Sequence, residues 1–180
     1  MDKRKGFLIL LLLWIVLILY LSFQTYQQQS IQPWLRTFYT QEQLAAKLPD
    51  WTIHYLGGEV AAKTRPFTFV EFLVRKGAHV CIYALLALLS YLGFATFISK
   101  ALWRIGAVMA VVLLVAGFDE WNQSFTTTRT GVVQDIGIDL LGAALVVLLV
   151  ILNQRWRTWK QKRSANLTTK SLTNLTTKLK

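Results

Sequence analysis

Four long apolar segments, each nearly free of charge, constrain this chain more than any other feature. The first runs from Gly6 to Phe23, 18 residues without a charged side chain. About 17–25 such residues are needed for a helix to cross the hydrocarbon core of a bilayer. Only 16% of the chain is charged, whereas about a quarter is typical of a soluble domain. We therefore predict an all-α membrane protein with four transmembrane helices in a compact bundle.

The first segment also has the positively charged start of a secretory signal peptide, formed by Lys3, Arg4 and Lys5. Its apolar stretch is longer than the roughly 7–15 residues of a signal-peptide core, and no small-residue cleavage site follows it. We therefore interpret residues 6–23 as a retained transmembrane helix.

The other three predicted spans cover residues 69–98, 102–123 and 132–152. The first of these three is long, since its 30 residues would extend ~45 Å at ~1.5 Å per residue. The hydrocarbon core is only ~30 Å thick, so we expect about two turns to stand outside it. Thr68 and Glu71 have the spacing of a capping box at the start of this helix.

The distribution of charge predicts how the spans are oriented. With four spans both termini share a side, which carries thirteen Lys and Arg and one acid, against seven and eight on the other side. Cytoplasmic loops of membrane proteins are the basic ones. We therefore predict a multi-pass protein of the cell membrane with both termini in the cytoplasm. The basic tail at residues 153–180 is then cytoplasmic, and the loop at residues 24–68 is extracytoplasmic.

The loop at residues 24–68 has too much apolar patterning for a linker. Between Ile31 and Leu48 the apolar side chains recur at helical spacing, which predicts an amphipathic helix on the membrane surface. The stretch from Trp51 to Lys63 has strand-like halves around two glycines and predicts a small β-hairpin. We expect a mixed outer loop between the first two spans.

Polar side chains gather at the outer ends of the last three spans. Arg75, His79 and Tyr83 follow one another at four-residue intervals, so they share one face of a helix. We predict a candidate polar cluster made of Arg75, Lys76, His79, Tyr83, Asp119, Glu120, Gln123, Arg129, Asp135 and Asp139. An ionised Asp near the bilayer centre costs about 2.5–3.5 kcal/mol on insertion scales. The acids should therefore point into the bundle and pair with its cations, which would hold the helices together.

The same residues form a recognisable pattern, Arg75-Lys76-x-Ala78-His79-x3-Tyr83 followed by Asp119-Glu120-x2-Gln123-x5-Arg129-x5-Asp135-x3-Asp139-x2-Gly142. In this pattern the chain resembles the VanZ-like family of bacterial membrane proteins, with a VanZ-like core at residues 70–142. Thr126-Thr127-Thr128 departs from the Pro-Gly expected before the arginine. The resemblance implies a cell-envelope protein, and the family is named for a member linked to resistance against the glycopeptide teicoplanin. A contribution to such resistance is therefore an expectation, without an implied mechanism for particular residues.

Four roles are open for the polar cluster. It can be a structural ion-pair network that organises the outer face. It can bind an anionic envelope component, a lipid-linked phosphate or a peptidoglycan carboxylate, through Arg75, Lys76 and Arg129. It can belong to an enzyme acting on a lipid-linked substrate, with His79 as general base and Glu120 as general acid. A transporter ranks last, because the second half of the last span is wholly apolar.

Several partners and cofactors are not expected. The basic residues flank long apolar runs, so the lipid bilayer is the expected partner and nucleic acid is not. A single cysteine excludes an internal disulfide. The chain has no Gly-rich phosphate loop, no nucleophile elbow and no His-His or His-Glu ligand spacing. We therefore predict no cofactor and no metal, and an enzymatic role is favoured less than a structural or binding role.

Overall fold

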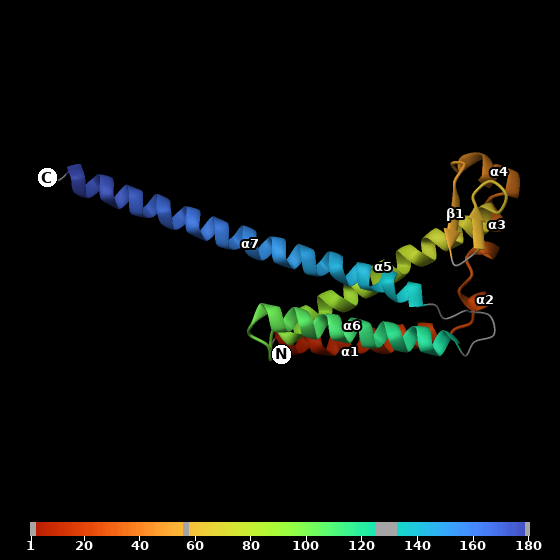
Figure 1. The fold of residues 1–180 in the computed structure, drawn as a ribbon, viewed down its shortest axis with the longest axis horizontal. Helices are drawn as coiled ribbons and strands as arrows, with labels where there is room; N and C mark the ends of the chain where they lie inside the picture. The colour runs from red at the N-terminus through yellow and green to blue at the C-terminus, as the bar shows by residue number, and fades with distance from the viewer. Residues whose placement is uncertain (1–2, 56–57, 125–132, 179–180) are drawn as a thin grey trace.

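The computed structural model describes the backbone of residues 3–55, 58–124 and 133–178, and the side chains of residues 5–55, 58–123 and 134–164. Within these residues, four helices are long and apolar enough to span a membrane. They are α1 (Lys3–Ser22), α5 (Pro66–Phe94), α6 (Ala101–Ser124) and α7 (Val133–Lys178) (Figure 1). The predicted multi-pass helical architecture is confirmed.

The four long helices pack around an apolar core in which α5 contacts the other three. Leu86, Val108 and Ala143, from α5, α6 and α7, are fully buried there. Large apolar side chains such as Leu114 and Leu149 point outward and are exposed. Such exposure is unfavourable in water and is expected where helices face acyl chains.

Helices α5 and α7 come into close backbone contact at Gly142. A Cβ atom there would overlap the backbone carbonyl oxygen of Val80 and lie 3.1 Å from the backbone nitrogen of Ala84. Only glycine fits, since small residues allow helix backbones to come this close. Gly142 follows Asp139 by less than one turn, so this contact also fixes where the acids of α7 lie against α5.

A smaller layer of structure connects α1 to α5. It contains α2 (Tyr26–Gln29), α3 (Gln32–Phe38), α4 (Gln41–Lys47) and an antiparallel hairpin of β1 (Thr52–Tyr55) and β2 (Gly58–Ala61). We call it the loop layer, residues 24–65. Leu35, Leu44 and Phe67 form its small core against the start of α5. The prediction of helical structure and a small hairpin between the first two spans is confirmed.

The start of α5 differs from the prediction. The helix begins at Pro66 with Arg65 as its N-cap, and the predicted capping box of Thr68 and Glu71 is not formed. Proline suits the first helical turn, because its fixed φ is helical and the missing N–H would have no partner there. Glu71 is buried in the second turn instead, with a different function described below.

The inner end of α5 also differs from the prediction, since the helix ends at Phe94 rather than at residue 98. The chain must turn back before α6 begins at Ala101. The Arg104 guanidinium donates two hydrogen bonds to the Ile98 carbonyl, at 2.9 and 2.6 Å, and stabilises this turn. The carbonyl group of Ile98, beyond the end of α5, thus accepts hydrogen bonds from a side chain of α6 and not from the backbone of a further helical turn.

Helix α7 continues past the predicted end of the fourth span at residue 152 and reaches Lys178 (Figure 1). No glycine or proline follows Gly142, and the Gln, Arg and Lys residues between 154 and 163 favour helix. The predicted tail therefore extends the span as one helix. Both termini lie at one end of the bundle, the terminal end, and the loop layer lies at the other, the loop end (Figure 1).

Candidate functional site

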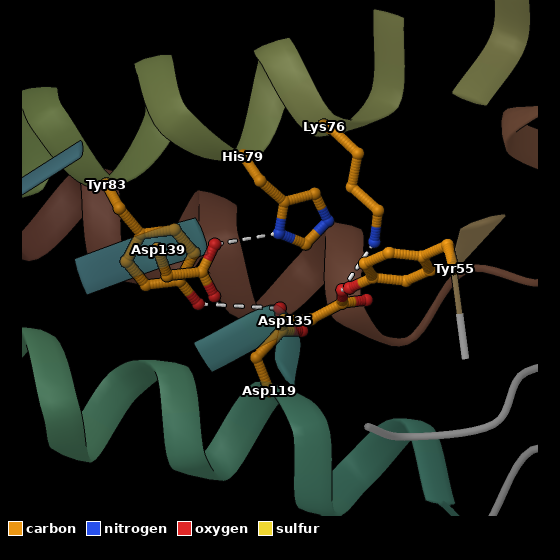
Figure 2. A network of polar contacts seen from close by, with 7 residues as sticks. All are labelled: Tyr55, Lys76, His79, Tyr83, Asp119, Asp135 and Asp139. Atoms are coloured by element: carbon orange, nitrogen blue, oxygen red, sulfur yellow. Dashed lines mark hydrogen bonds and ion pairs between the residues drawn. The ribbon is translucent and has the colours of Figure 1, made fainter. Parts of the chain in front are cut away.

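Polar side chains from three long helices and the hairpin meet inside the bundle at its loop end (Figure 2). We call this group the polar network. It consists of Tyr55, Lys76, His79, Tyr83, Asp119, Asp135 and Asp139. Side chains three or four residues apart share a helix face, so Lys76 and His79 of α5 meet Asp135 and Asp139 of α7 at successive levels, and Tyr83 of the same face meets Asp119 of α6.

The level nearest the loop layer joins α5, α7 and β1. The Lys76 ammonium and the Tyr55 hydroxyl both donate to Oδ1 of Asp135 (Figure 2). Burial raises the pKa of Tyr55, and so do the hydrogen bond to Asp135, its negative charge and those of Glu120 and Asp139. Tyr55 therefore remains a neutral donor that ties the hairpin to the start of α7.

One turn deeper, His79 pairs with Asp139. His79 Nδ1 lies 2.9 Å from Asp139 Oδ1, and the Asp139 side chain is completely buried while that of His79 is 22% exposed. The second carboxylate oxygen, Oδ2, is also buried and has no hydrogen-bond partner among the described residues. Buried polar atoms are almost always hydrogen-bonded. Asp139 thus keeps capacity for one more donor or for a cation.

The deepest level brings a third helix to the same imidazole. The hydroxyl of buried Tyr83 donates to Oδ2 of Asp119 on α6 at 3.4 Å, which is long for such a bond. The Tyr83 and His79 rings stack with centroids 6.3 Å apart. One oxygen of Asp119, one oxygen of Asp139 and one nitrogen of His79 lie within 4.8 Å of one another. The network therefore places two acids from separate helices beside one histidine.

A cavity of about 340 Å³ lies beside the network, between α1, α5 and α6. This volume falls within the roughly 300–1,000 Å³ of ligand pockets. Apolar side chains form most of its wall. Its polar lining consists of Ser22, Gln29, Arg75, His79, Tyr83, Asp119 and Gln123. The arrangement suits a ligand with an apolar body and a polar group.

The Arg75 guanidinium borders this cavity. Its Cζ lies 4.9 Å from the centroid of the Tyr26 ring, and it forms no ion pair with a described residue. Its Nη1 is buried without a hydrogen-bond partner in the described part of the chain. A guanidinium offers five N–H donors in a rigid fork, so Arg75 is positioned by an aromatic face while donors stay available for an anion.

Glu71 links the loop layer to α5, a contact that sequence reasoning missed. It is 1% exposed, and its Oε2 accepts hydrogen bonds from the Tyr26 hydroxyl and the Gln32 amide, each at 2.6 Å. Its Oε1 accepts one from the Ile31 backbone at 3.1 Å. Three donors compensate the burial of one carboxylate. These donors lie 39–45 residues away in the sequence, so local spacing could not reveal them.

The remaining predicted residues are placed as follows. Glu120 and Gln123 are buried near the loop end of α6. Arg129 lies outside the described residues, so its pairing stays a prediction. Tyr55 was not predicted as a site residue, and the only signal for it was its place in a predicted hairpin strand.

Within the described residues, the predicted polar cluster contains more carboxylates than permanently charged cationic side chains. Its four carboxylates face two cations, and one of these, Lys76, is paired with Asp135. The third cation of the predicted cluster, Arg129, lies outside the described residues. The geometry therefore offers three chemistries: an anion site at Arg75, a histidine oriented by a carboxylate, and a donor set for a cation.

Comparison with known proteins gives one match. A family model described as VanZ/LLP1 matches residues 7–157. The matched region runs from α1 into α7 and includes every residue of the polar network. No curated protein and no solved structure matches the chain.

Proposed function

Because the chain belongs to the VanZ/LLP1 family, we propose that it is a cell-envelope protein that binds an anionic envelope component in the cavity beside Arg75. One observation carries this proposal. The Arg75 guanidinium borders an apolar cavity, and its buried Nη1 has no partner among the described residues.

The chemistry of the cavity favours a phosphate or carboxylate attached to an apolar chain. A guanidinium binds either anion in a bidentate manner. Ile18 and Leu21 of α1 and Val74 and Ile82 of α5 supply apolar wall that an acyl or prenyl chain can contact. A lipid-linked envelope precursor combines both features.

The binding and structural roles divide between neighbouring residues of α5. Lys76 is engaged by Asp135 and Tyr55, so it holds the loop layer and α7 together. Arg75 has no such partner among the described residues, and it carries the charge for binding. The ion-pair network thus organises the loop end, while the adjacent cavity accepts the ligand.

The charge distribution supports an orientation with the loop end outside the cell and both termini in the cytoplasm. The cavity then lies on the side of the membrane where the wall is assembled. A protein that binds a wall precursor there would change the access of a glycopeptide to its target. This supports a contribution to teicoplanin-type resistance.

Binding can be tested on the purified full-length protein by native mass spectrometry with a polyprenyl phosphate and with the uncharged polyprenol. The protein should retain the polyprenyl phosphate and lose the polyprenol. A peptidoglycan stem peptide, which has carboxylates but no lipid, tests the alternative source of the anion. Equal retention of phosphate and alcohol would refute an anion site.

Two arginine variants make the test specific. Arg75→Gln should lower retention of the phosphate about tenfold, since one charged hydrogen-bonding group is worth about 1.5–3 kcal/mol. Arg36→Gln is the matched control, because Arg36 lies 4.3 Å from the Phe67 ring in a similar cation–π contact but does not line the cavity. Equal loss of binding in both variants would contradict the assignment to Arg75.

A second candidate is an enzyme that acts on a lipid-linked substrate in the same cavity. His79 favours it, because it lines the cavity and its Nδ1 is oriented by Asp139, as carboxylates orient general-base histidines. Turnover of a polyprenyl diphosphate should then be lost in His79→Gln while retention of the lipid persists. Absence of turnover in the wild-type protein would leave binding as the function.

A further inference from the structure

We propose that His79, Asp119 and Asp139 form a binding site for a divalent transition-metal ion of the Zn²⁺ or Mn²⁺ type. Their donor atoms, one ring nitrogen and two carboxylate oxygens, lie within 4.8 Å of one another. The three residues come from α5, α6 and α7. A bound ion would therefore cross-link three membrane helices at one point.

The distances are close to those of a coordination sphere. Nitrogen and oxygen ligands lie about 2.0–2.2 Å from zinc, which places neighbouring donors roughly 3.4 Å apart. His79 Nδ1 and Asp139 Oδ1 are already 2.9 Å apart. Asp119 is held by a long 3.4 Å hydrogen bond from Tyr83, so its carboxylate is weakly restrained, and one of its oxygens lies within 4.8 Å of the other two donors.

An independent observation points to a missing partner at this place. Asp139 is completely buried, and its Oδ2 has no hydrogen-bond donor among the described residues. A buried carboxylate oxygen without a partner is unfavourable, because it has lost its hydrogen bonds to water and has no hydrogen bond from the protein in their place. A cation bound between Asp139 and His79 would compensate that loss.

The charge around the site favours a divalent ion. Protonation of His79 would add one positive charge beside two carboxylates, Asp119 and Asp139, whereas a divalent ion balances both. The negative charges of Glu120 and Asp139 also act on the loop layer, since they contribute to raising the pKa of Tyr55 in the hairpin. Imidazole together with carboxylate suits zinc or manganese, while magnesium and calcium prefer all-oxygen sites.

The cavity gives the site access and an open position. His79 and Asp119 both line it, so an ion can enter without displacing the helices. Three protein ligands leave at least one coordination position for water or a ligand group. The metal site does not depend on anion binding by Arg75, which is not one of its ligands. An ion on Nδ1 would replace the proton between His79 and Asp139, so it excludes the general-base arrangement described above.

Metal binding can be measured on the full-length protein in detergent, stripped with a chelator and then titrated with Zn²⁺ and with Mn²⁺ alone. We expect about one equivalent per chain, with affinity reduced at least about tenfold in Asp139→Asn and in His79→Gln. Asp135→Asn is the control, since this acid lies one turn away on α7 and pairs with Lys76. It should keep most of the affinity. No stoichiometric binding, or equal binding by Asp139→Asn, overturns the proposal.

A spectroscopic measurement on the wild-type protein covers the case in which Asp139→Asn does not fold. Pulsed electron paramagnetic resonance of the Mn²⁺-loaded protein should show coupling to the ¹⁴N nucleus of one imidazole. His54, the other histidine, is exposed on the hairpin, and His54→Gln should leave that coupling unchanged. Binding without nitrogen coupling, or coupling lost in His54→Gln, would rule out the site. Because no lipid is added, this result is separate from the outcome for Arg75.

Discussion

The two ends of the bundle use polar side chains in different ways. At the terminal end, the Arg104 guanidinium donates to the carbonyl of Ile98 and lies 4.9 Å from the Tyr91 ring centroid. The Tyr91 hydroxyl in turn accepts a hydrogen bond from the Gln154 amide at 2.6 Å. These contacts join α5, α6 and α7 through neutral acceptors, and no carboxylate takes part in them.

At the loop end, charged groups meet across the same three helices. Lys76 pairs with Asp135, but Arg75 Nη1 and Asp139 Oδ2 are buried without hydrogen-bond partners among the described residues. In the described part of the terminal end, the buried side-chain atoms without a partner are hydroxyls, on Ser90 and Thr96. Unsatisfied charged atoms are far more costly than unsatisfied hydroxyls. Polar side chains at the terminal end therefore serve helix packing, whereas the loop end keeps buried charged atoms that the described residues do not satisfy.

The largest expected effect breaks the helix contact on which the loop end depends. Gly142→Leu should destabilise the protein by more than about 3 kcal/mol, because the new side chain overlaps the α5 backbone at Val80. Gly137→Ala on the same helix is the control, since a Cβ there has no atom within 4 Å. Thermal unfolding in detergent measures both. Similar melting temperatures for the two variants would show that close approach of α5 and α7 is not required.

The second-largest effect is expected from a variant that weakens the contact between the loop layer and the bundle. Glu71→Ala removes the acceptor of three hydrogen bonds and should cost about 2–3 kcal/mol. Limited proteolysis should then cut within residues 24–65 while the long helices persist. Glu59→Ala, which removes a 69% exposed carboxylate paired with His54, should change stability by less than about 0.5 kcal/mol. Equal protease resistance of the two variants would argue against Glu71 as an anchor.

A charge exchange tests whether the network has a structural role. Lys76→Asp and Asp135→Lys should each cost about 2 kcal/mol, less than the about 3–5 kcal/mol of a fully buried pair, because both side chains keep some exposure. The double variant should regain part of the lost stability in the same unfolding assay. Additive losses in the double variant would mean that the two charges do not interact.

The smallest effect on stability is expected from a variant at the terminal end. Gln154→Ala removes one hydrogen bond to Tyr91 and should cost about 0.5–1 kcal/mol. Retention of polyprenyl phosphate and of Zn²⁺ should both stay at the wild-type level. A change in either would show that the terminal end influences the site at the loop end.

The sequence was sufficient for the elements whose signal is local. Each span is a long apolar run, and the gathering of Lys76, His79 and Tyr83 on one side of α5 followed from their helical spacing. The extent of α7 was underestimated, because hydropathy marks where a span leaves the lipid and not where its helix stops.

The pairings could not be predicted, because they depend on how the helices cross. The partner of His79 is set by the register of α7, which the contact at Gly142 determines. The donors to Glu71 come from a separate layer of the molecule, so the acid was assigned to a nearby cap. The donor set of His79, Asp119 and Asp139 spans three helices and has no motif spacing.

The length of α7 has a consequence for the basic tail. Its 46 residues correspond to ~69 Å at ~1.5 Å per residue, more than twice the ~30 Å of the hydrocarbon core. A substantial part of this rod must project into water beyond the terminal end. Electrostatic attraction to a lipid surface fades over ~8 Å at physiological salt. If α7 stays near the bilayer normal, the far end of its backbone lies farther from the headgroups than this distance, so the helix extends away from the membrane surface.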